Sequence, residues 1–252
     1  MMAVRSRAFE NREHRRYWWH KNPSRKYVPP AYALLTDAEW DVLEEWYDET
    51  ERHNMVGECT VPLVSIVQGF VGGSGITRIV QCGHYVGYST LMLGFLLRHM
   101  GRKQSLFSID IDPLANSVSQ RWVDRAQLNE QVHLELGDSS DLSMPARATK
   151  YLGGTPQLVI IDSSHEYHHT IRELNLWYDV IPPHAMILLH DTSIFAAPFD
   201  SGKNGGVRQA LADWAKGKPV AVLNLNESFK SGDGNDLVYA DPCGIGLIHK
   251  LA

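Results

Sequence analysis

The feature that most constrains the fold is a regular alternation of apolar and amphipathic segments along residues 77–249. Short apolar runs predict five strands at 77–82, 105–110, 132–136, 158–162 and 186–189, and two closing strands at 220–225 and 245–249. The segments between them predict helices at about 88–100, 114–128, 141–152, 166–180 and 207–216. Because strands that alternate with helices of this length form a parallel sheet covered on both faces, we expect a doubly wound α/β domain of about seven strands.

The chain before residue 77 predicts a helical extension. Thr36-Asp37-Ala38-Glu39 has the spacing of a capping box, so a helix is expected to begin there. A second, mostly apolar helix is expected at about 62–70, ended by the glycine-rich segment 72–75. We therefore predict two parts, an N-terminal arm and helix over residues 1–60 and the α/β domain over residues 61–252.

The formal net charge of −5 conceals an uneven distribution. Residues 1–30 hold eight basic and two acidic side chains, so this arm carries +6 and the rest of the chain carries −11. The arm also contains Tyr17, Trp18 and Trp19, and a basic and aromatic mixture can stack on nucleic acid. Because no motif of a nucleic-acid-binding fold is present, we expect instead a lid or a contact between subunits of a homo-oligomer, and no nucleic-acid partner.

Length and cysteine content favour a cytoplasmic protein without a membrane partner. The chain has 252 residues and lacks an apolar run of the roughly 18–20 residues that cross a bilayer. Its three cysteines include no C-x-x-C pair, which argues against a disulfide framework and against a thiolate zinc site.

Polar residues follow each predicted parallel strand, where ligands bind in sheets of this kind. Two glycines four residues apart, Gly83 and Gly87, let the chain pass close to a ligand and turn into a helix. Their spacing is G-x-x-x-G, which differs from the G-x-G-x-x-G of dinucleotide-binding folds. Asp110 ends the next strand and is placed to accept hydrogen bonds from ribose hydroxyls, and Asp138-Ser139 follows the third strand.

Acidic and imidazole groups follow the fourth and fifth strands. Asp162 and Asp191 are predicted at neighbouring strand ends, where two carboxylates can share a hard divalent cation. His165 lies three residues after Asp162 and is a candidate general base, and His190 directly precedes Asp191. The loop 193–206 that follows is expected to cover a substrate.

These motifs together resemble those of class I S-adenosylmethionine-dependent O-methyltransferases over about residues 77–214. Gly83-His84-Tyr85-Val86-Gly87-Tyr88-Ser89 is similar to the first motif of the catechol O-methyltransferases. Asp162-Ser163-Ser164-His165 with His190-Asp191 resembles the arrangement in antibiotic-sugar methyltransferases and in the cephalosporin-hydroxylase and rhamnosyl methyltransferase group. The resemblance implies a Rossmann-like sheet, S-adenosylmethionine as cofactor, and a small hydroxylated substrate such as a sugar or a natural-product precursor.

The resemblance also implies roles for individual residues. Cofactor contacts fall on the first motif and on the ends of the second and third strands, namely Gln81, Gly83, Tyr85, Gly87, Ser89, Asp110, Asp138 and Ser139. His165 takes the position of the base. Asp162 and Asp191 take the positions of the Mg²⁺ ligands, with His190 beside them.

Two residues depart from the family pattern. Gln81 stands where the family has an acid that contacts the amino end of the cofactor, so an ionic contribution is lost there. His190 replaces an acid next to the second metal-binding carboxylate, and imidazole suits softer metals better than Mg²⁺. Three alternatives therefore stay open: a cation held by two carboxylates and water, a metal such as Mn²⁺ or Fe²⁺, and catalysis without metal.

Two other functions compete with methyl transfer. His165-Glu166-Tyr167-His168-His169 matches H-E-x-x-H, the helix motif of zinc peptidases, with His190 or Asp191 as a third ligand. This interpretation leaves the glycine loop and Asp110 without a role, and it places a cation near the positive end of a helix dipole. The second competitor is a cofactor-binding fold that has lost catalysis and serves as an interaction protein.

Overall fold

The computed structural model describes residues 28–59, 61–230 and 241–252. The basic and aromatic arm that we expect to act as a lid or subunit contact lies within residues 1–27, outside the described residues. That expectation, and the division of the chain at residue 60, stay predictions.

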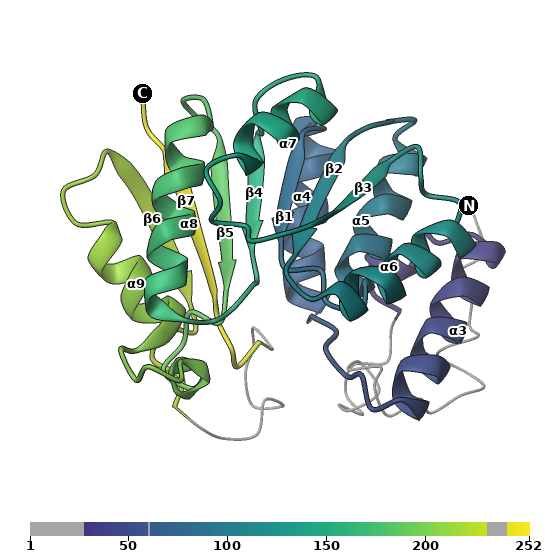
Figure 1. Cartoon of the computed structure of the whole chain (residues 1–252), viewed down its shortest axis with the longest axis horizontal. Helices are drawn as coiled ribbons and strands as arrows, with labels where there is room; N and C mark the ends of the chain where they lie inside the picture. The colour runs from purple at the N-terminus through teal and green to yellow at the C-terminus, as the bar shows by residue number, and fades with distance from the viewer. Residues whose placement is uncertain (1–27, 60, 231–240) are drawn as a thin grey trace.

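A seven-stranded sheet forms the centre of the molecule, as predicted (Figure 1). Its strands are β1 (Ile79–Cys82), β2 (Leu106–Asp110), β3 (Val132–Leu136), β4 (Leu158–Ile161), β5 (Met186–His190), β6 (Val220–Leu225) and β7 (Ile245–Lys250). They lie in the order β3-β2-β1-β4-β5-β7-β6, with β1 to β5 parallel and β7 antiparallel to both of its neighbours. The order reverses between β1 and β4, which is the point where ligands bind in an open α/β sheet.

Helices cover both faces of the sheet, so the Rossmann-like fold class is confirmed. The helices are α2 (Pro30–Ala33), α3 (Asp37–Arg52), α4 (Val61–Ser74), α5 (Tyr88–His99), α6 (Pro113–Arg125), α7 (Met144–Leu152), α8 (Tyr167–Val180) and α9 (Gly206–Trp214), with a short 3₁₀ helix, η2, at Ala197–Phe199. Among the described residues, no helix combines the length and hydropathy that a membrane crossing requires.

Two predicted helix ends were wrong, since α6 ends at Arg125 and not at about residue 128, and α4 is longer than predicted. Helix α4 continues to Ser74, through Gly72 and Gly73, instead of ending at about residue 70. A glycine in a helix lowers stability by only about 1 kcal/mol relative to alanine, and the buried face that holds Val67 extends to Val71, directly before the exposed glycines. The helix ends where Gly75 adopts a left-handed conformation with φ of 69°.

Successive strand residues point into two separate cores. Ile79 packs in the core under α2 to α6, whereas its neighbour Val80 packs in the core under α7 to α9. Because side chains alternate across a sheet that is buried on both faces, every residue of the central strands must be apolar or fully paired. This explains why the sequence signal of these strands is a continuous apolar run.

The N-terminal helices form part of the core and support the glycine loop. The capping box of α3 is formed as predicted, with hydrogen bonds between Thr36 and Glu39 in both directions. Trp46 of α3 is fully buried, and its indole N–H donates to the carbonyl of Val86 at 2.8 Å. Tyr32 of α2 forms a hydroxyl–hydroxyl hydrogen bond with Tyr88, the first residue of α5. Helices α2 and α3 therefore hold the loop after β1 in place.

Candidate active site

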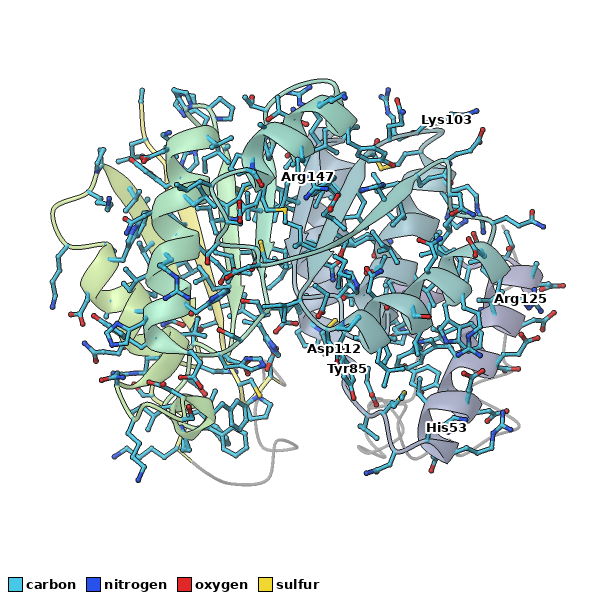
Figure 2. All side chains as sticks on the ribbon, in the orientation of Figure 1. His53, Tyr85, Lys103, Asp112, Arg125 and Arg147 are labelled. Atoms are coloured by element: carbon cyan, nitrogen blue, oxygen red, sulfur yellow. The ribbon has the colours of Figure 1, made fainter. Side chains whose placement is uncertain are left out.

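A cleft of about 720 Å³ opens at the carboxyl ends of the parallel strands. Figure 2 shows Tyr85 and Asp112, which follow β1 and β2, at the lower edge of the molecule, opposite Lys103, which precedes β2. Ten of the predicted site residues line the cleft: Gly83, Tyr85, Ser89, Asp110, Asp138, Ser139, Asp162, His165, His190 and Asp191. Two others, Gln81 and Gly87, are not part of its wall.

Both glycines of the loop after β1 are required by close backbone contacts. A Cβ atom on Gly83, whose φ is 88°, would lie 2.1 Å from the carbonyl oxygen of Asp162 at the end of β4. Gly87, with φ of 95°, is the N-cap of α5 and packs against Ser119. Gly83 therefore brings the loop against the end of β4, whereas Gly87 makes the turn into the helix and does not reach the cleft.

Asp110 fixes the same loop and still faces the cleft. Its Oδ2 accepts hydrogen bonds from the backbone N–H groups of His84 at 3.0 Å and of Tyr85 at 2.8 Å. Its Oδ1 accepts from the N–H of Asp112 at 3.0 Å. A carboxylate offers about four acceptor positions, so these three bonds leave it able to accept one more from a ligand hydroxyl.

Gln81 is hydrogen-bonded to neighbouring side chains, and its predicted contact with a cofactor stays a prediction. It is buried, and its amide nitrogen donates to Ser89 Oγ at 2.5 Å. Its amide oxygen accepts from the hydroxyls of Thr90 at 2.9 Å and Ser108 at 3.2 Å. Because these neighbours use both ends of the amide, Gln81 acts by orienting Ser89, and Ser89 is the member of this group that lines the cleft.

His165 and Asp191 form a hydrogen-bonded pair in the cleft. Nδ1 of His165 lies 2.6 Å from Oδ2 of Asp191. Both residues have a φ of 60°, a left-handed conformation that costs a non-glycine residue roughly 1–2 kcal/mol. Burial lowers the pKa of His165, but the hydrogen bond and the charge of Asp191 outweigh it, so the pKa lies above its ordinary value. This contact to Nδ1 leaves the other ring nitrogen, Nε2, for a substrate.

His190 is enclosed by carboxylates. Its Nδ1 lies 3.3 Å from Asp162 Oδ1 and 3.6 Å from Asp191 Oδ2, and its Nε2 lies 3.3 Å from Asp241 Oδ2. Burial lowers the pKa of His190, but the charges of Asp162 and Asp191 raise it well above the ordinary value. For Asp191 the effects have the opposite sign. Burial raises its pKa, but the charge of His190 and the hydrogen bond from His165 outweigh burial and bring the pKa below the usual range.

These distances fit a bound cation. Donor atoms that share an ion through bonds of about 2.1 Å lie roughly 3–3.5 Å apart, close to the spacings between His190 Nδ1 and the two carboxylates. Ligand atoms of Asp162, His165 and Asp191 also lie within 4.8 Å of one another. The two carboxylates can therefore be joined by the imidazole of His165 or of His190, and the ligand atoms of His190, Asp241 and Cys243 form a second group within the same distance.

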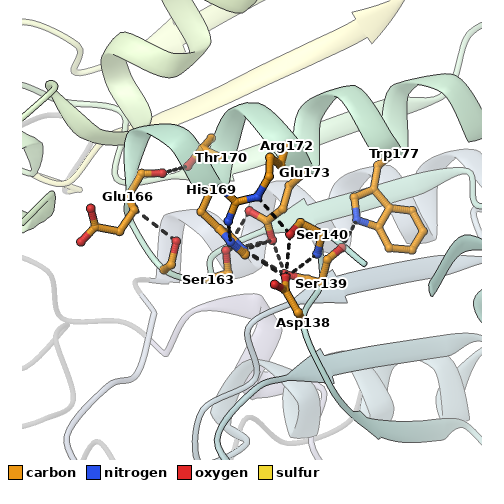
Figure 3. Close-up of polar contacts among 11 residues, drawn as sticks. Asp138, Ser139, Ser140, Ser163, Glu166, His169, Thr170, Arg172, Glu173 and Trp177 are labelled. Atoms are coloured by element: carbon orange, nitrogen blue, oxygen red, sulfur yellow. Dashed lines mark hydrogen bonds and ion pairs between the residues drawn. The ribbon is translucent and has the colours of Figure 1, made fainter. Parts of the chain in front are cut away.

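Sequence reasoning missed a second buried network beside the cleft (Figure 3). Glu173 of α8 is fully buried and accepts hydrogen bonds from Ser139 Oγ at 2.5 Å and Ser163 Oγ at 2.8 Å. Nε2 of His169 lies 3.4 Å from the same carboxylate, and the pKa of His169 is raised because Glu173 outweighs the effect of burial. One helix residue therefore joins the loops that follow β3 and β4. A glutamate seven residues into a helix after Asp-Ser-Ser-His gave no sequence signal of its own.

Asp241 was also missed. It lies before β7 in the sequence, but the sheet brings it against His190, and it is fully buried. Its only sequence signal is an Asp-Pro turn ahead of a predicted closing strand.

The H-E-x-x-H interpretation is not supported by the geometry. Helix α8 begins at Tyr167, so His165 and Glu166 precede it and cannot share a helix face with His169. Glu166 instead accepts the backbone N–H of Ser201 at 3.0 Å. His165 pairs with Asp191 and His169 with Glu173, so the two histidines belong to different networks.

Comparison with known proteins agrees with this geometry. Residues 80–192 match the family model for a methyltransferase domain. This segment is a methyltransferase domain. The match spans β1 to the residues after β5, and therefore includes the glycine loop, Asp110, Asp138, Asp162, His165 and Asp191. With the fold, it confirms the prediction of a class I, S-adenosylmethionine-dependent methyltransferase.

The methyltransferase also resembles solved structures across most of its length. The O-methyltransferase of Bacillus cereus, solved in complex with SAH, is 16% identical, covers 86% of this chain and 92% of its own, and has a TM-score of 0.64. The O-methyltransferase TomG of Streptomyces achromogenes, involved in tomaymycin synthesis, is 17% identical with 86% and 91% covered and a TM-score of 0.61. The SAH-bound Podospora anserina methyltransferase PaMTH1 is 14% identical with 86% and 89% covered and a TM-score of 0.63. At these identities the likeness establishes the shared fold.

Proposed function

We propose that this methyltransferase transfers a methyl group from S-adenosylmethionine to a hydroxyl oxygen of a small molecule, with His165 as the general base. The observation that carries the proposal is the His165–Asp191 pair, which lies in the same cleft as the glycine loop and Asp110. A sugar or a natural-product precursor is the substrate class that we favour. A cytoplasmic location remains part of the same proposal.

The chain's own groups suit a positively charged cofactor. Five carboxylates line the cleft, from Glu58, Asp110, Asp138, Asp162 and Asp191. Asp110 would accept a ribose hydroxyl, Gly83 and Tyr85 would bring the loop backbone against the methionine part, and Ser89 would lie beside it. Ser139 would flank the adenine, held there by Glu173. S-adenosylmethionine supplies an already activated methyl group, so the protein needs only to align the acceptor oxygen and remove its proton.

His165 is arranged to accept that proton. Asp191 holds Nδ1–H, which directs the lone pair of the neutral ring to Nε2. Nε2 would accept the hydroxyl proton as the acceptor oxygen takes the methyl group that S-adenosylmethionine supplies. A base of this kind contributes roughly 10²–10⁴-fold to the rate. Phe199 of η2 packs edge-on to the His165 ring, 6.0 Å between centroids, and lines the cleft on the substrate side.

A divalent cation is part of the proposal. Asp162 and Asp191 would hold it through carboxylate oxygens, with Nδ1 of His190 as a third donor. Such an ion lowers the pKa of a coordinated hydroxyl and fixes its orientation.

Two measurements test the function. Calorimetry should show that the full chain binds S-adenosylhomocysteine, and a panel of hydroxylated small molecules with radiolabelled S-adenosylmethionine should yield a methylated product. His165→Ala should retain cofactor binding and lose methyl transfer. If cofactor binds but no acceptor is methylated, the competing interpretation of an inactive interaction protein gains support. If His165→Ala remains fully active, the assignment of the base is wrong.

A further inference from the structure

One imidazole in the cleft is held between two sets of carboxylates. His190 presents Nδ1 to Asp162 and Asp191, at the proposed cation position, and Nε2 to Asp241 on the opposite side of the ring. Asp241 lies outside the segment that matches the methyltransferase family model, and so does the turn that carries it.

We propose that Asp241 is a positioning residue that makes His190 a metal ligand, and that the centre therefore prefers a transition-metal ion such as Mn²⁺ to Mg²⁺. This inference rests on the cation in the proposed function and identifies both the ion and the residue that selects it.

The Asp241 carboxylate is held rigidly. The residue is fully buried, and its Oδ1 accepts the backbone N–H of Cys243 at 3.1 Å. The side-chain amide of Asn226 donates to the Asp241 carbonyl at 2.6 Å and fixes the backbone. The other carboxylate oxygen, Oδ2, is the atom that meets Nε2 of His190 at 3.3 Å. The carboxylate is thus fixed in position before any ion binds.

A fixed carboxylate beside Nε2 determines whether Nδ1 is available as a metal ligand. It keeps a proton on Nε2, so an imidazole that loses its Nδ1 proton to solvent as an ion binds directs its lone pair from Nδ1 toward Asp162 and Asp191. A ligating histidine commonly has such a carboxylate on its other nitrogen, and loss of that partner lowers metal affinity by about 10–100-fold. Asp241 also prevents the ring from rotating away from the two aspartates.

The resulting donor set favours a transition metal. Mg²⁺ is bound mainly by oxygen, whereas imidazole nitrogen suits Fe²⁺ and its transition-metal neighbours, among which Mn²⁺ also takes carboxylate oxygens. Two carboxylates and one imidazole also leave coordination positions for the oxygens of an acceptor. His190 in place of an acid would thus change which metal binds, while the site keeps its function.

The test uses the full chain and four preparations: the unaltered protein, Asp241→Asn, His190→Glu and Glu58→Gln. Glu58 lines the same cleft, so Glu58→Gln removes the same charge from the cleft and serves as the matched control. Mn²⁺ and Mg²⁺ are titrated separately by calorimetry. We expect Mn²⁺ to bind the unaltered protein at least 10-fold more tightly than Mg²⁺. Asp241→Asn should lower Mn²⁺ affinity about 10–100-fold, His190→Glu should remove or reverse the preference, and Glu58→Gln should leave it unchanged.

Pulsed electron paramagnetic resonance of bound Mn²⁺ gives a second readout that does not depend on activity. Coupling to an imidazole nitrogen should be present in the unaltered protein and absent in His190→Glu. Equal affinity for the two ions, or the absence of nitrogen coupling, would overturn the inference. The same holds if Asp241→Asn behaves like Glu58→Gln. A thiolate-to-metal charge-transfer band with Co²⁺ would also overturn it, because it would place the ion with Cys243 on the Nε2 side.

Failure of the proposed function is distinguishable from failure of this inference. S-adenosylhomocysteine binding and methyl transfer are measured on the same preparations. Metal preference with no methyl transfer would contradict the function alone, and methyl transfer with a preference for Mg²⁺ would contradict the inference alone.

Discussion

Two clusters in this molecule contain buried carboxylates with histidine partners, but they differ in the other cationic side chains that neutralise those carboxylates. In the first, Glu39 of α3 lies 2.5 Å from the Arg98 guanidinium and 2.9 Å from the His99 imidazole, both on α5. In the second, at the cleft, the carboxylates of Asp162, Asp191 and Asp241 are paired with the imidazoles of His165 and His190.

The difference is the type of cation. Hydrogen bonds from His99, which has the largest lowering effect, and from Arg98, whose guanidinium is always charged, neutralise Glu39 within the protein, and its pKa falls to about 2. Burial alone would raise that pKa, but the hydrogen bonds from His99, Arg98 and the Thr36 backbone outweigh it. The cleft cluster has three carboxylates and, among the ion pairs of the described residues, only histidine partners. We infer that the first cluster stabilises the fold, whereas the second keeps negative charge available for a cationic ligand.

The largest expected effect is on the cleft cluster. His165→Gln should lower kcat by roughly 10²–10⁴-fold, because it removes the base while keeping a side chain of similar shape. The midpoint of urea unfolding and the affinity for S-adenosylhomocysteine should change little. His168→Gln, on the exposed first turn of α8, is the matched control and should keep full activity. A large loss of stability in His165→Gln would contradict the division of roles between the clusters.

A substitution in the first cluster should affect stability and leave catalysis unchanged. Glu39→Gln should lower the free energy of unfolding by about 2–3 kcal/mol, because a buried carboxylate with charged hydrogen-bond donors is replaced by a neutral amide. Urea denaturation measures the loss, and kcat per folded molecule should be unchanged. A fall in kcat without a fall in stability would show that α3 affects the chemistry.

Glu39 should also make the free energy of unfolding depend on pH, with stability lost as the pH falls. The pKa of Glu39 is lowered from 4.5 to about 2 on folding, so its contribution is fully present above about 4.5 and is lost as the pH falls toward 2. The difference in unfolding free energy between the unaltered protein and Glu39→Gln should therefore shrink over that interval. A constant difference across it would rule out ionised Glu39 as the source.

A smaller effect is expected where a buried acid serves the cleft indirectly. Glu173→Gln should raise KM for S-adenosylmethionine about 10-fold, because Ser139 and Ser163 lose the charged acceptor that holds their loops together. We expect kcat to change less than KM, since Glu173 does not line the cleft. Steady-state kinetics at saturating acceptor separates the change in kcat from the change in KM. Equal losses in kcat and in kcat/KM would place Glu173 in the chemical step.

The sheet was predictable because its strands are continuous apolar runs separated by helix patterns of ordinary length. The residues that face the cleft from β1 to β5 were predictable for a related reason: parallel strands end at one edge, so residues such as Asp110, Asp162 and Asp191 must meet there. The resemblance then assigned their roles.

What sequence could not supply depends on three-dimensional packing. Glu173 and Asp241 reach the site from a helix interior and from the turn before an antiparallel strand, positions with no periodic signal. Gln81 has a residue type and position typical of a cofactor contact, yet its neighbours Ser89, Thr90 and Ser108 use its amide. Whether a polar side chain is satisfied by its own protein is a property of the folded neighbourhood.

The smallest predicted effect concerns an exposed ion pair, which tests whether burial or pairing alone gives the Glu39 cluster its contribution to stability. Arg125 of α6 makes two hydrogen bonds to Glu45 of α3, at 2.7 and 2.9 Å, but both side chains are about half exposed. Water and salt screen such a pair, so a double-mutant cycle with Arg125→Ala and Glu45→Ala should give a coupling energy of about 0.2–1 kcal/mol, falling further at high ionic strength. The exposed Arg125–Glu45 pair would then stabilise the fold several times less than the buried contacts of Glu39 do. A coupling energy of about 2 kcal/mol or more would show that geometry, and not burial, decides the strength of the Arg125–Glu45 pair.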